Sequence, residues 1–100
     1  HSPFMASAAD ALREALDGVS LKAPSRTVYS NVTARPHASD PVEIKDALCK
    51  QLTAGVLWED TIVDMIKADI DALYEPAPGK QLTSMMRRIS AAHHPKMKNV

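Results

Sequence analysis

Histidine is the side chain best suited to move protons near neutral pH, and the chain opens with one, His1. Ser2 is a favourable helix N-cap and Pro3 suits a first helical turn, so the sequence predicts a helix directly after His1. An imidazole there is carried by a rigid element yet stays outside its hydrogen bonds, which suits a general base. The alternative is that His1 is an arbitrary chain start or the remnant of a tag.

A second candidate is Gln51, an amide among apolar residues. Ile44, Ala47, Leu48 and Leu52 recur at helical spacing, and Gln51 falls on the same face. A buried amide needs hydrogen-bond partners, which makes Gln51 a candidate site residue. The alternative is that it only caps backbone groups near the end of that helix.

Other chemistries are disfavoured by the residue pattern. His93 and His94 are adjacent, point in different directions and lack a well-spaced carboxylate, so we expect no metal site. Cys49 is the single cysteine and lies inside a predicted helix, which indicates a reducing compartment and an unreactive thiol. No Gly-x-Ser-x-Gly elbow is present, so the sequence offers a base without a nucleophile.

Size and charge narrow the class of protein. One hundred residues make at most one domain, and we expect 1–100 to be a single partial domain. Twelve basic residues balance twelve acidic ones, which argues against nucleic acid or an acidic membrane as a partner. No apolar run approaches the roughly 18 residues that a membrane helix requires.

The elements that must position these residues follow in the order helix–strand–helix–helix–strand–helix. Their apolar stripes place Phe4, Met65, Met85 and Met86 on inner faces. Two strands are too few for a parallel sheet, so we expect residues outside this chain to complete it. The predicted elements are a helix from Pro3 to a left-handed Gly18, a strand over 26–33, a helix capped by Asp40 and begun by Pro41, a helix from Trp58, a strand over 70–75, a turn at 76–79, a helix whose start includes Lys80, and an irregular tail or short edge strand over 91–100.

Five motifs, in this order and at compatible spacing, resemble the C-terminal portion of the malonyl-CoA:acyl carrier protein transacylase family of type II fatty acid synthesis. The resemblance covers about residues 1 to 90. The motifs are His1-Ser2-Pro3-Phe4-Met5, Tyr29-Ser30-Asn31-Val32, Lys50-Gln51-Leu52-Thr53, Trp58-Glu59 and Pro78-Gly79-Lys80-Gln81-Leu82-Thr83.

The resemblance implies an α/β fold class: this chain would be the C-terminal part of an α/β-hydrolase-like acyltransferase core, with helices packed on short parallel strands. It also implies a ping-pong mechanism. A serine takes the malonyl group from coenzyme A and passes it to the phosphopantetheine thiol of acyl carrier protein. No cofactor is bound, and the coenzyme A thioester is a substrate.

Three site residues follow from the resemblance. His1 matches the general base, Gln51 matches the residue whose main-chain carbonyl orients the base, and Asn31 matches a residue near the substrate. The helix after His1 and the helix bearing Gln51 would then meet end to side. The nucleophilic serine, the arginine for the malonyl carboxylate and the oxyanion donors belong to the family's N-terminal portion. That remainder of the enzyme is therefore an expected partner, beside malonyl-CoA and acyl carrier protein.

Two departures from the family pattern leave a second hypothesis open. Ala77 replaces a glycine before Pro78, and Ala54-Gly55 replaces Ser-Pro. Together with the missing nucleophile, they allow a non-catalytic acyltransferase-like scaffold or partner-binding fragment. For the enzyme, the expected location is the cytoplasm in a bacterium and the mitochondrion or plastid in a eukaryote.

Overall fold

The computed structural model describes residues 2–100 of the chain, which divides into two compact units. Unit 1 is His1–Thr61 and unit 2 is Ile62–Val100. The expectation that residues 1–100 form a single partial domain stays a prediction. In chain order the elements are the 3-10 helix η1 (Pro3–Met5), α1 (Ala6–Asp17), α2 (Pro41–Gln51), α3 (Trp58–Lys67), β1 (Leu73–Glu75), α4 (Gln81–Ile89), the 3-10 helix η2 (His94–Lys96) and β2 (Met97–Asn99).

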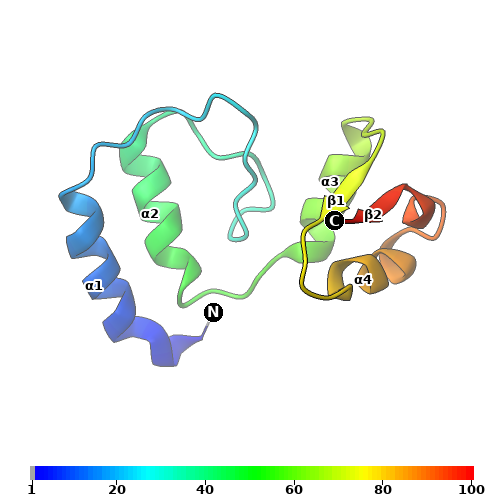
Figure 1. Cartoon of the computed structure of the whole chain (residues 1–100). Helices are drawn as coiled ribbons and strands as arrows, with labels where there is room; N and C mark the ends of the chain where they lie inside the picture. Colours follow the sequence, from blue (N-terminus) through cyan, green and yellow to red (C-terminus); the bar gives the residue numbers. More distant parts are fainter. Residues whose placement is uncertain (1) are drawn as a thin grey trace. The chain divides into compact units, whose positions relative to one another are not determined.

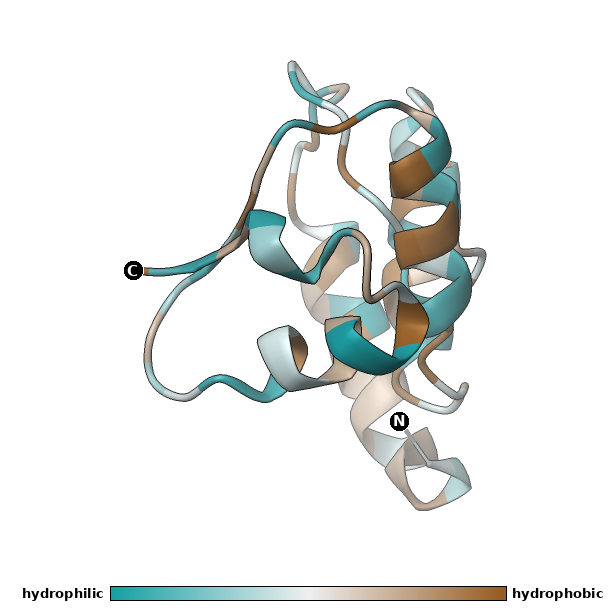
Figure 2. Ribbon diagram, turned by 90° about the vertical axis from the view of Figure 1, so that its right-hand side faces the viewer, coloured by the Kyte–Doolittle hydropathy of each residue, from teal (hydrophilic) through white to brown (hydrophobic). Residues whose placement is uncertain are grey.

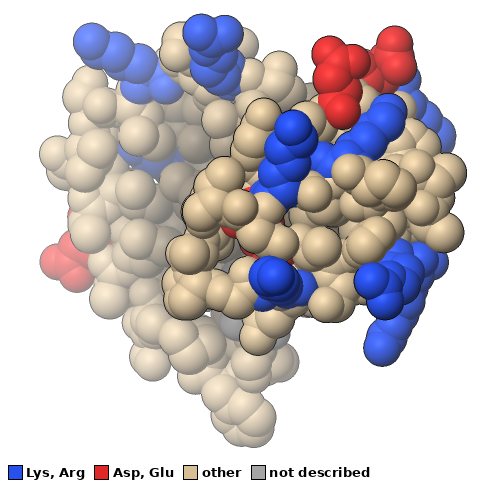
Figure 3. Space-filling view, turned by 45° about the vertical axis from the view of Figure 1, so that its right-hand side comes forward, with Lys and Arg blue, Asp and Glu red and all other residues tan. Residues whose placement is uncertain are grey.

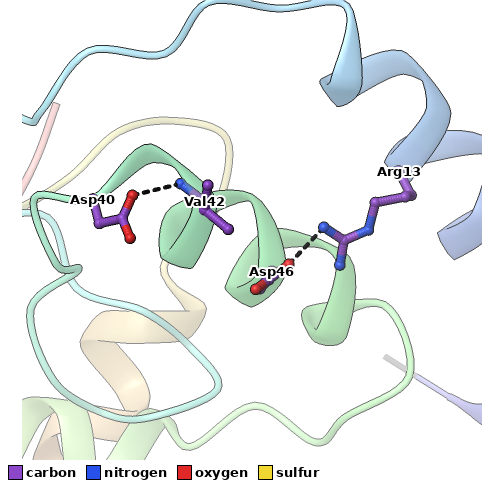
Figure 4. A network of polar contacts seen from close by, with 4 residues as sticks. All are labelled: Arg13, Asp40, Val42 and Asp46. Atoms are coloured by element: carbon purple, nitrogen blue, oxygen red, sulfur yellow. Dashed lines mark hydrogen bonds and ion pairs between the residues drawn. The ribbon is translucent and has the colours of Figure 1, made fainter.

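Unit 1 is built on α1 and α2, which pack side by side (Figure 1). A guanidinium nitrogen of Arg13 lies 2.6 Å from a carboxylate oxygen of Asp46, joining the two helices (Figure 4). Just after the C-terminal end of α1, the ammonium group of Lys45 donates to the carbonyl of Val19 at 2.7 Å. Before the N-terminal end of α1, the N–H of Ser2 donates to the carbonyl of Leu52, at the end of α2, at 2.9 Å. The helices therefore run antiparallel along their lengths, and the expected end-to-side meeting is wrong.

The start of α2 follows the sequence prediction closely. Asp40 has an extended backbone and its carboxylate accepts a hydrogen bond of 3.0 Å from the backbone N–H of Val42, while Pro41 takes the first helical position (Figure 4). This cap satisfies one of the N–H groups that a helix start leaves without a partner. The predicted beginning of this helix is confirmed.

The first helix begins less regularly than predicted. Ser2 does cap it, accepting from the N–H of Phe4 at 3.3 Å, but the first turn is the 3-10 helix η1. A 3-10 helix has 3.0 residues per turn, whereas an α-helix has 3.6. Phe4 is therefore rotated away from the apolar stripe of α1, and its side chain is 96% exposed. Its predicted place on an inner face is wrong. Gly18 does end α1, but with right-handed angles (φ −85°, ψ −1°).

The predicted strand over 26–33 is wrong. Residues 28–37 instead fold back on themselves: the N–H of Ser30 donates to the carbonyl of Arg35 at 2.8 Å, and a single antiparallel bridge joins Tyr29 to Pro36. Pro36 has no N–H to extend the pairing, and Ala34 adopts a left-handed conformation (φ 56°) that reverses the chain. The β-branched and aromatic residues here therefore form a tight turn.

Unit 2 contains a two-stranded parallel sheet. Leu73, Tyr74 and Glu75 of β1 pair with Met97, Lys98 and Asn99 of β2. The predicted strand over 70–75 is thus shorter than expected, and the tail takes the edge-strand alternative. Helix α4 packs against β2, so the predicted class, helices on short parallel strands, is confirmed.

A carboxylate buried beside the sheet caps α4 from a distance. Glu75, 5% exposed, accepts hydrogen bonds of 2.8 Å from the backbone N–H groups of Leu82 and Thr83. It also accepts from the Thr83 hydroxyl at 2.6 Å and from the Asn99 amide at 3.2 Å. These bonds lower the pKa of Glu75, the Thr83 hydroxyl contributing most. The side chain of Lys80, the residue before α4, makes no cap, because an ammonium group cannot accept a hydrogen bond; the carboxylate of Glu75 serves the N–H groups at the start of the helix instead.

The helices combine hydrophobic and hydrophilic residues along their lengths (Figure 2). In unit 2 the best buried apolar side chains are Ile62 and Met86, at 2% and 1% exposure. Met65 is half-buried and Met85 is 41% exposed, so the predicted inner place of Met85 is wrong. Lysine and arginine side chains project from the face shown in Figure 3. The last turn of α4 contains Arg87 and Arg88, whose positive charges are favourable at the negative end of the helix dipole.

Candidate functional site

The candidate base, His1, lies outside the described residues 2–100, but the backbone that follows it is fixed. The N–H of Ser2 donates to the carbonyl of Leu52 at 2.9 Å. Leu52 is the C-cap residue of α2, directly after Gln51. Two candidate residues that are 50 positions apart in the sequence therefore have chain neighbours joined by a backbone hydrogen bond.

Gln51 is the last residue of α2 and is half-buried. The turn that follows it is tight: the N–H of Leu52 donates to the carbonyls of Cys49 and Lys50, and the N–H of Thr53 also donates to Lys50. A helix C-terminus presents main-chain carbonyls with partial negative charge, which suits a hydrogen bond from an imidazole N–H. The predicted role of the Gln51 carbonyl stays a prediction.

Asn31, the candidate substrate residue, is half-buried in the tight turn after Ser30. Ser30 is 2% exposed and stabilises the turn, because its hydroxyl accepts from the N–H of Val32 at 3.2 Å and its carbonyl accepts from the N–H of Ala34 at 3.0 Å. The carbonyl of Asn31 accepts from the N–H of Leu57 at 2.9 Å. Asn31 is thereby joined to the chain immediately before α3.

The start of α3 is anchored by a buried threonine. Thr61, 1% exposed, donates twice to the carbonyl of Leu57, from its backbone N–H at 3.0 Å and from its hydroxyl at 2.7 Å. Trp58 follows Leu57 in the chain. Its indole N–H is buried and has no hydrogen-bond partner among residues 2–100. Helical spacing predicts both Trp58 and Thr61 on the inner side of this helix, and the burial of Thr61 confirms that part of the prediction.

Other polar groupings in the described chain do not include the candidate residues Asn31 and Gln51. A hollow of about 370 Å³ lies between the 28–37 turn and α2, and its lining includes Arg35, His37 and Glu43 but neither Asn31 nor Gln51. In unit 2 the Ser90 hydroxyl lies 2.7 Å from Nδ1 of His93, closing the end of α4. Residues 2–100 contain no group of three or more histidine, cysteine or acidic side chains arranged to bind a metal ion.

The chain is similar over most of its length to known enzymes. It is 35% identical over 89 residues to the malonyl-CoA–acyl carrier protein transacylase of Salmonella typhimurium, a match that covers 89% of this chain and 28% of that protein. It is 30% identical to a Mus musculus protein named as the mitochondrial transacylase, covering 87% of this chain and 24% of the relative. No family model matches the sequence.

The fold is similar as well. The crystal structure of the acyl-carrier-protein S-malonyltransferase from Burkholderia pseudomallei matches the whole of this chain and 32% of its own, with a TM-score of 0.88 and 34% identity. Sequence and fold therefore agree that the chain is homologous to a portion of an acyltransferase. Within that class the matched relatives are malonyl-CoA–acyl carrier protein transacylases, and the match is to their C-terminal portion, which confirms the resemblance. The chain spans less than a third of their length.

No helix within residues 2–100 combines the length and the apolar character needed to cross a lipid bilayer.

Proposed function

We propose that this chain supplies the general-base part of a transacylase that moves a malonyl group from coenzyme A to the phosphopantetheine thiol of acyl carrier protein. The observation that carries the proposal is the 2.9 Å hydrogen bond from Ser2 to Leu52, because it joins the residue after His1 to the residue after Gln51. The names of the similar proteins supply the acyl group and the two substrates. The serine nucleophile comes from the N-terminal portion of the complete enzyme.

In the first half-reaction, Nε2 of His1 accepts the serine proton while the serine oxygen attacks the malonyl thioester carbon. The carbon–sulfur bond breaks, and the coenzyme A sulfur takes the proton from His1. In the second half-reaction His1 accepts the proton of the phosphopantetheine thiol, whose sulfur attacks the serine ester, and then returns that proton to the serine oxygen. The reference pKa of histidine, about 6.5, leaves the ring neutral and ready to accept a proton near pH 7.

Gln51 fixes which ring nitrogen accepts. A main-chain carbonyl that accepts from Nδ1–H holds the tautomer with Nε2 unprotonated, as the carboxylate does in a Ser-His-Asp triad. Unlike a carboxylate, the carbonyl adds no full negative charge to stabilise the imidazolium. That is adequate for a thioester, whose thiolate leaving group needs less help than an amine. Asn31 contacts the bound substrate from the neighbouring turn.

The location follows the source of the protein: the cytoplasm in a bacterium and an organelle in a eukaryote, as the mitochondrial name of the Mus musculus relative suggests.

The test is His1→Ala in the complete enzyme, the polypeptide that joins this chain to the N-terminal transacylase portion. Removal of a general base costs about 10²–10⁴ in rate, so acylation of the serine and transfer to acyl carrier protein should both fall by that factor. Radiolabelled malonyl-CoA measures the two steps separately, and circular dichroism checks that the variant is folded. Rates within threefold of wild type in both steps would refute the assignment. The isolated 100-residue chain serves as the control and should transfer nothing.

A further inference from the structure

The segment 52–57, which connects α2 to α3, is bonded at both ends to parts of unit 1 that carry candidate site residues. At its first residue, the carbonyl of Leu52 accepts from the N–H of Ser2 at 2.9 Å. At its last residue, the N–H of Leu57 donates to the carbonyl of Asn31 at 2.9 Å. Gln51 directly precedes the segment. Six residues thus connect the chain beside His1, the end of α2 and the Asn31 turn.

The two ends of this segment differ in how they are fixed. Leu52 continues the last turn of α2, so its carbonyl direction follows from the helix. Leu57 is fixed from the other side, because the buried Thr61 donates to its carbonyl from both the backbone N–H and the hydroxyl. The N–H of Leu57 belongs to the peptide plane on the other side of the same Cα, and it donates to the carbonyl of Asn31. Thr61 therefore anchors, from the carbonyl side, the residue whose N–H reaches Asn31.

We propose that Leu57 and Thr61 are positioning residues of the active site, which fix the Asn31 turn relative to the base. The proposal rests on the proposed function, since it assigns the two residues to the binding of the acyl substrate. Leu57 acts through its backbone N–H, and Thr61 acts through the carbonyl of Leu57. Because the chain beside His1 is bonded to Leu52 instead, loss of the Leu57–Asn31 bond should disturb substrate binding more than proton transfer.

Leu57→Pro tests the bond itself. Proline removes the N–H that reaches Asn31, and because Leu57 precedes the first residue of α3, that N–H is not one of the helix's own hydrogen-bond donors. Leu57→Ala is the matched control, since it removes the same side chain and keeps the N–H. In the complete enzyme we expect the KM for malonyl-CoA to rise about tenfold in Leu57→Pro relative to Leu57→Ala, with kcat within about threefold. Equal KM values in the two variants would overturn the proposal.

A second pair of variants tests Thr61, which anchors Leu57 through two hydrogen bonds to its carbonyl. Thr61→Val keeps the shape of the side chain and deletes the hydroxyl, whereas Thr61→Ser keeps the hydroxyl and deletes a methyl group. We expect Thr61→Val to raise the KM for malonyl-CoA and Thr61→Ser to restore it, because only the serine can donate to the Leu57 carbonyl. A purely structural role predicts the reverse, since the serine leaves a cavity at a site that is 1% exposed.

These outcomes are separate from failure of the proposed function. If the wild-type complete enzyme transfers no malonyl group, or if His1→Ala keeps its activity, the proposed function is wrong. If the wild-type enzyme is active and depends on His1 while neither Leu57→Pro nor Thr61→Val changes the KM, the assignment of Leu57 and Thr61 alone is refuted.

Discussion

Two substitutions of Gln51 separate the work of its main-chain carbonyl from that of its side chain. Gln51→Ala keeps the carbonyl at the end of α2 and replaces glutamine with a slightly better helix former, a difference of a few tenths of a kcal/mol. If the carbonyl is the working group, this variant should keep its transacylase rate within about threefold. Any loss would come from the contacts of the amide.

Gln51→Pro is expected to displace the main-chain carbonyl of residue 51. As the last helical residue, Gln51 can donate its N–H to the carbonyl four residues earlier, and proline both removes that donor and clashes with the preceding turn. The cost is about 3 kcal/mol or more, and 1.4 kcal/mol is a factor of ten in an equilibrium constant. The native arrangement at the end of α2 should therefore become at least about 100-fold less populated. The Ser2–Leu52 bond, one residue further on, would be lost with it.

The assay is malonyl transfer from coenzyme A to acyl carrier protein by the complete enzyme, compared at matched folded fraction by circular dichroism. Lys50→Ala, a substitution at the exposed neighbouring residue, is the control for a change in this turn of α2. The wild-type enzyme, Lys50→Ala and Gln51→Ala should have similar transfer rates, and the rate of Gln51→Pro should be far lower. A folded Gln51→Ala enzyme as inactive as His1→Ala would refute the carbonyl account and make the amide the working group.

Two further predictions concern stability in unit 2. The hydrogen bonds that lower the pKa of Glu75 below its usual 4.5 make the folded state bind the proton less readily than the unfolded state. Their stabilisation is therefore complete above about pH 5 and is lost as the pH falls through the folded-state pKa. The urea midpoint of the wild-type complete enzyme should accordingly fall more than that of Glu75→Gln on acidification, and parallel curves would contradict the assignment. Met86→Ala should cost about 2–5 kcal/mol because Met86 is 1% exposed, whereas Met85→Ala, at a residue that is 41% exposed, should cost about 1 kcal/mol or less. Equal urea midpoints for the two alanine variants would show that burial does not decide the difference.

Local signals in the sequence predicted the helices well. Asp40 and Pro41 predict the start of α2 from their capping chemistry alone. The cap and the N–H group that it accepts from, in Val42, lie within three positions of one another. The same reasoning identified Ser2 as a cap but could not show that the first turn is a 3-10 helix, which moved Phe4 to the surface. Helix caps are readable because their partners are close in sequence.

Pairing between distant residues could not be predicted in the same way. Residues 26–33 have strand-like composition, yet strand formation depends on a partner, and here the nearest partner is the segment that includes Pro36. The carboxylate of Glu75 caps a helix that begins six residues later, and no spacing rule for N-caps covers that arrangement. Motifs in the sequence predicted which residues belong to the candidate site, but not how those residues are connected. The hydrogen bonds from Ser2 to Leu52 and from Leu57 to Asn31 join backbone groups. Because every residue except proline has the same backbone groups, the residue types do not indicate such bonds.

The parallel pairing of β1 with β2 sets the order in which unit 2 can assemble. The cap that Glu75 provides to α4 spans seven or eight residues, so it can form as soon as α4 has been synthesised. The pairing with β2 and the bond from Asn99 to Glu75 span 24 residues and must wait for the last strand. Until then the edge of β1 that β2 covers is open, with unpaired N–H and C=O groups that a foreign strand could bind. Pairing with β2 therefore engages the backbone groups along this edge of β1 in hydrogen bonds.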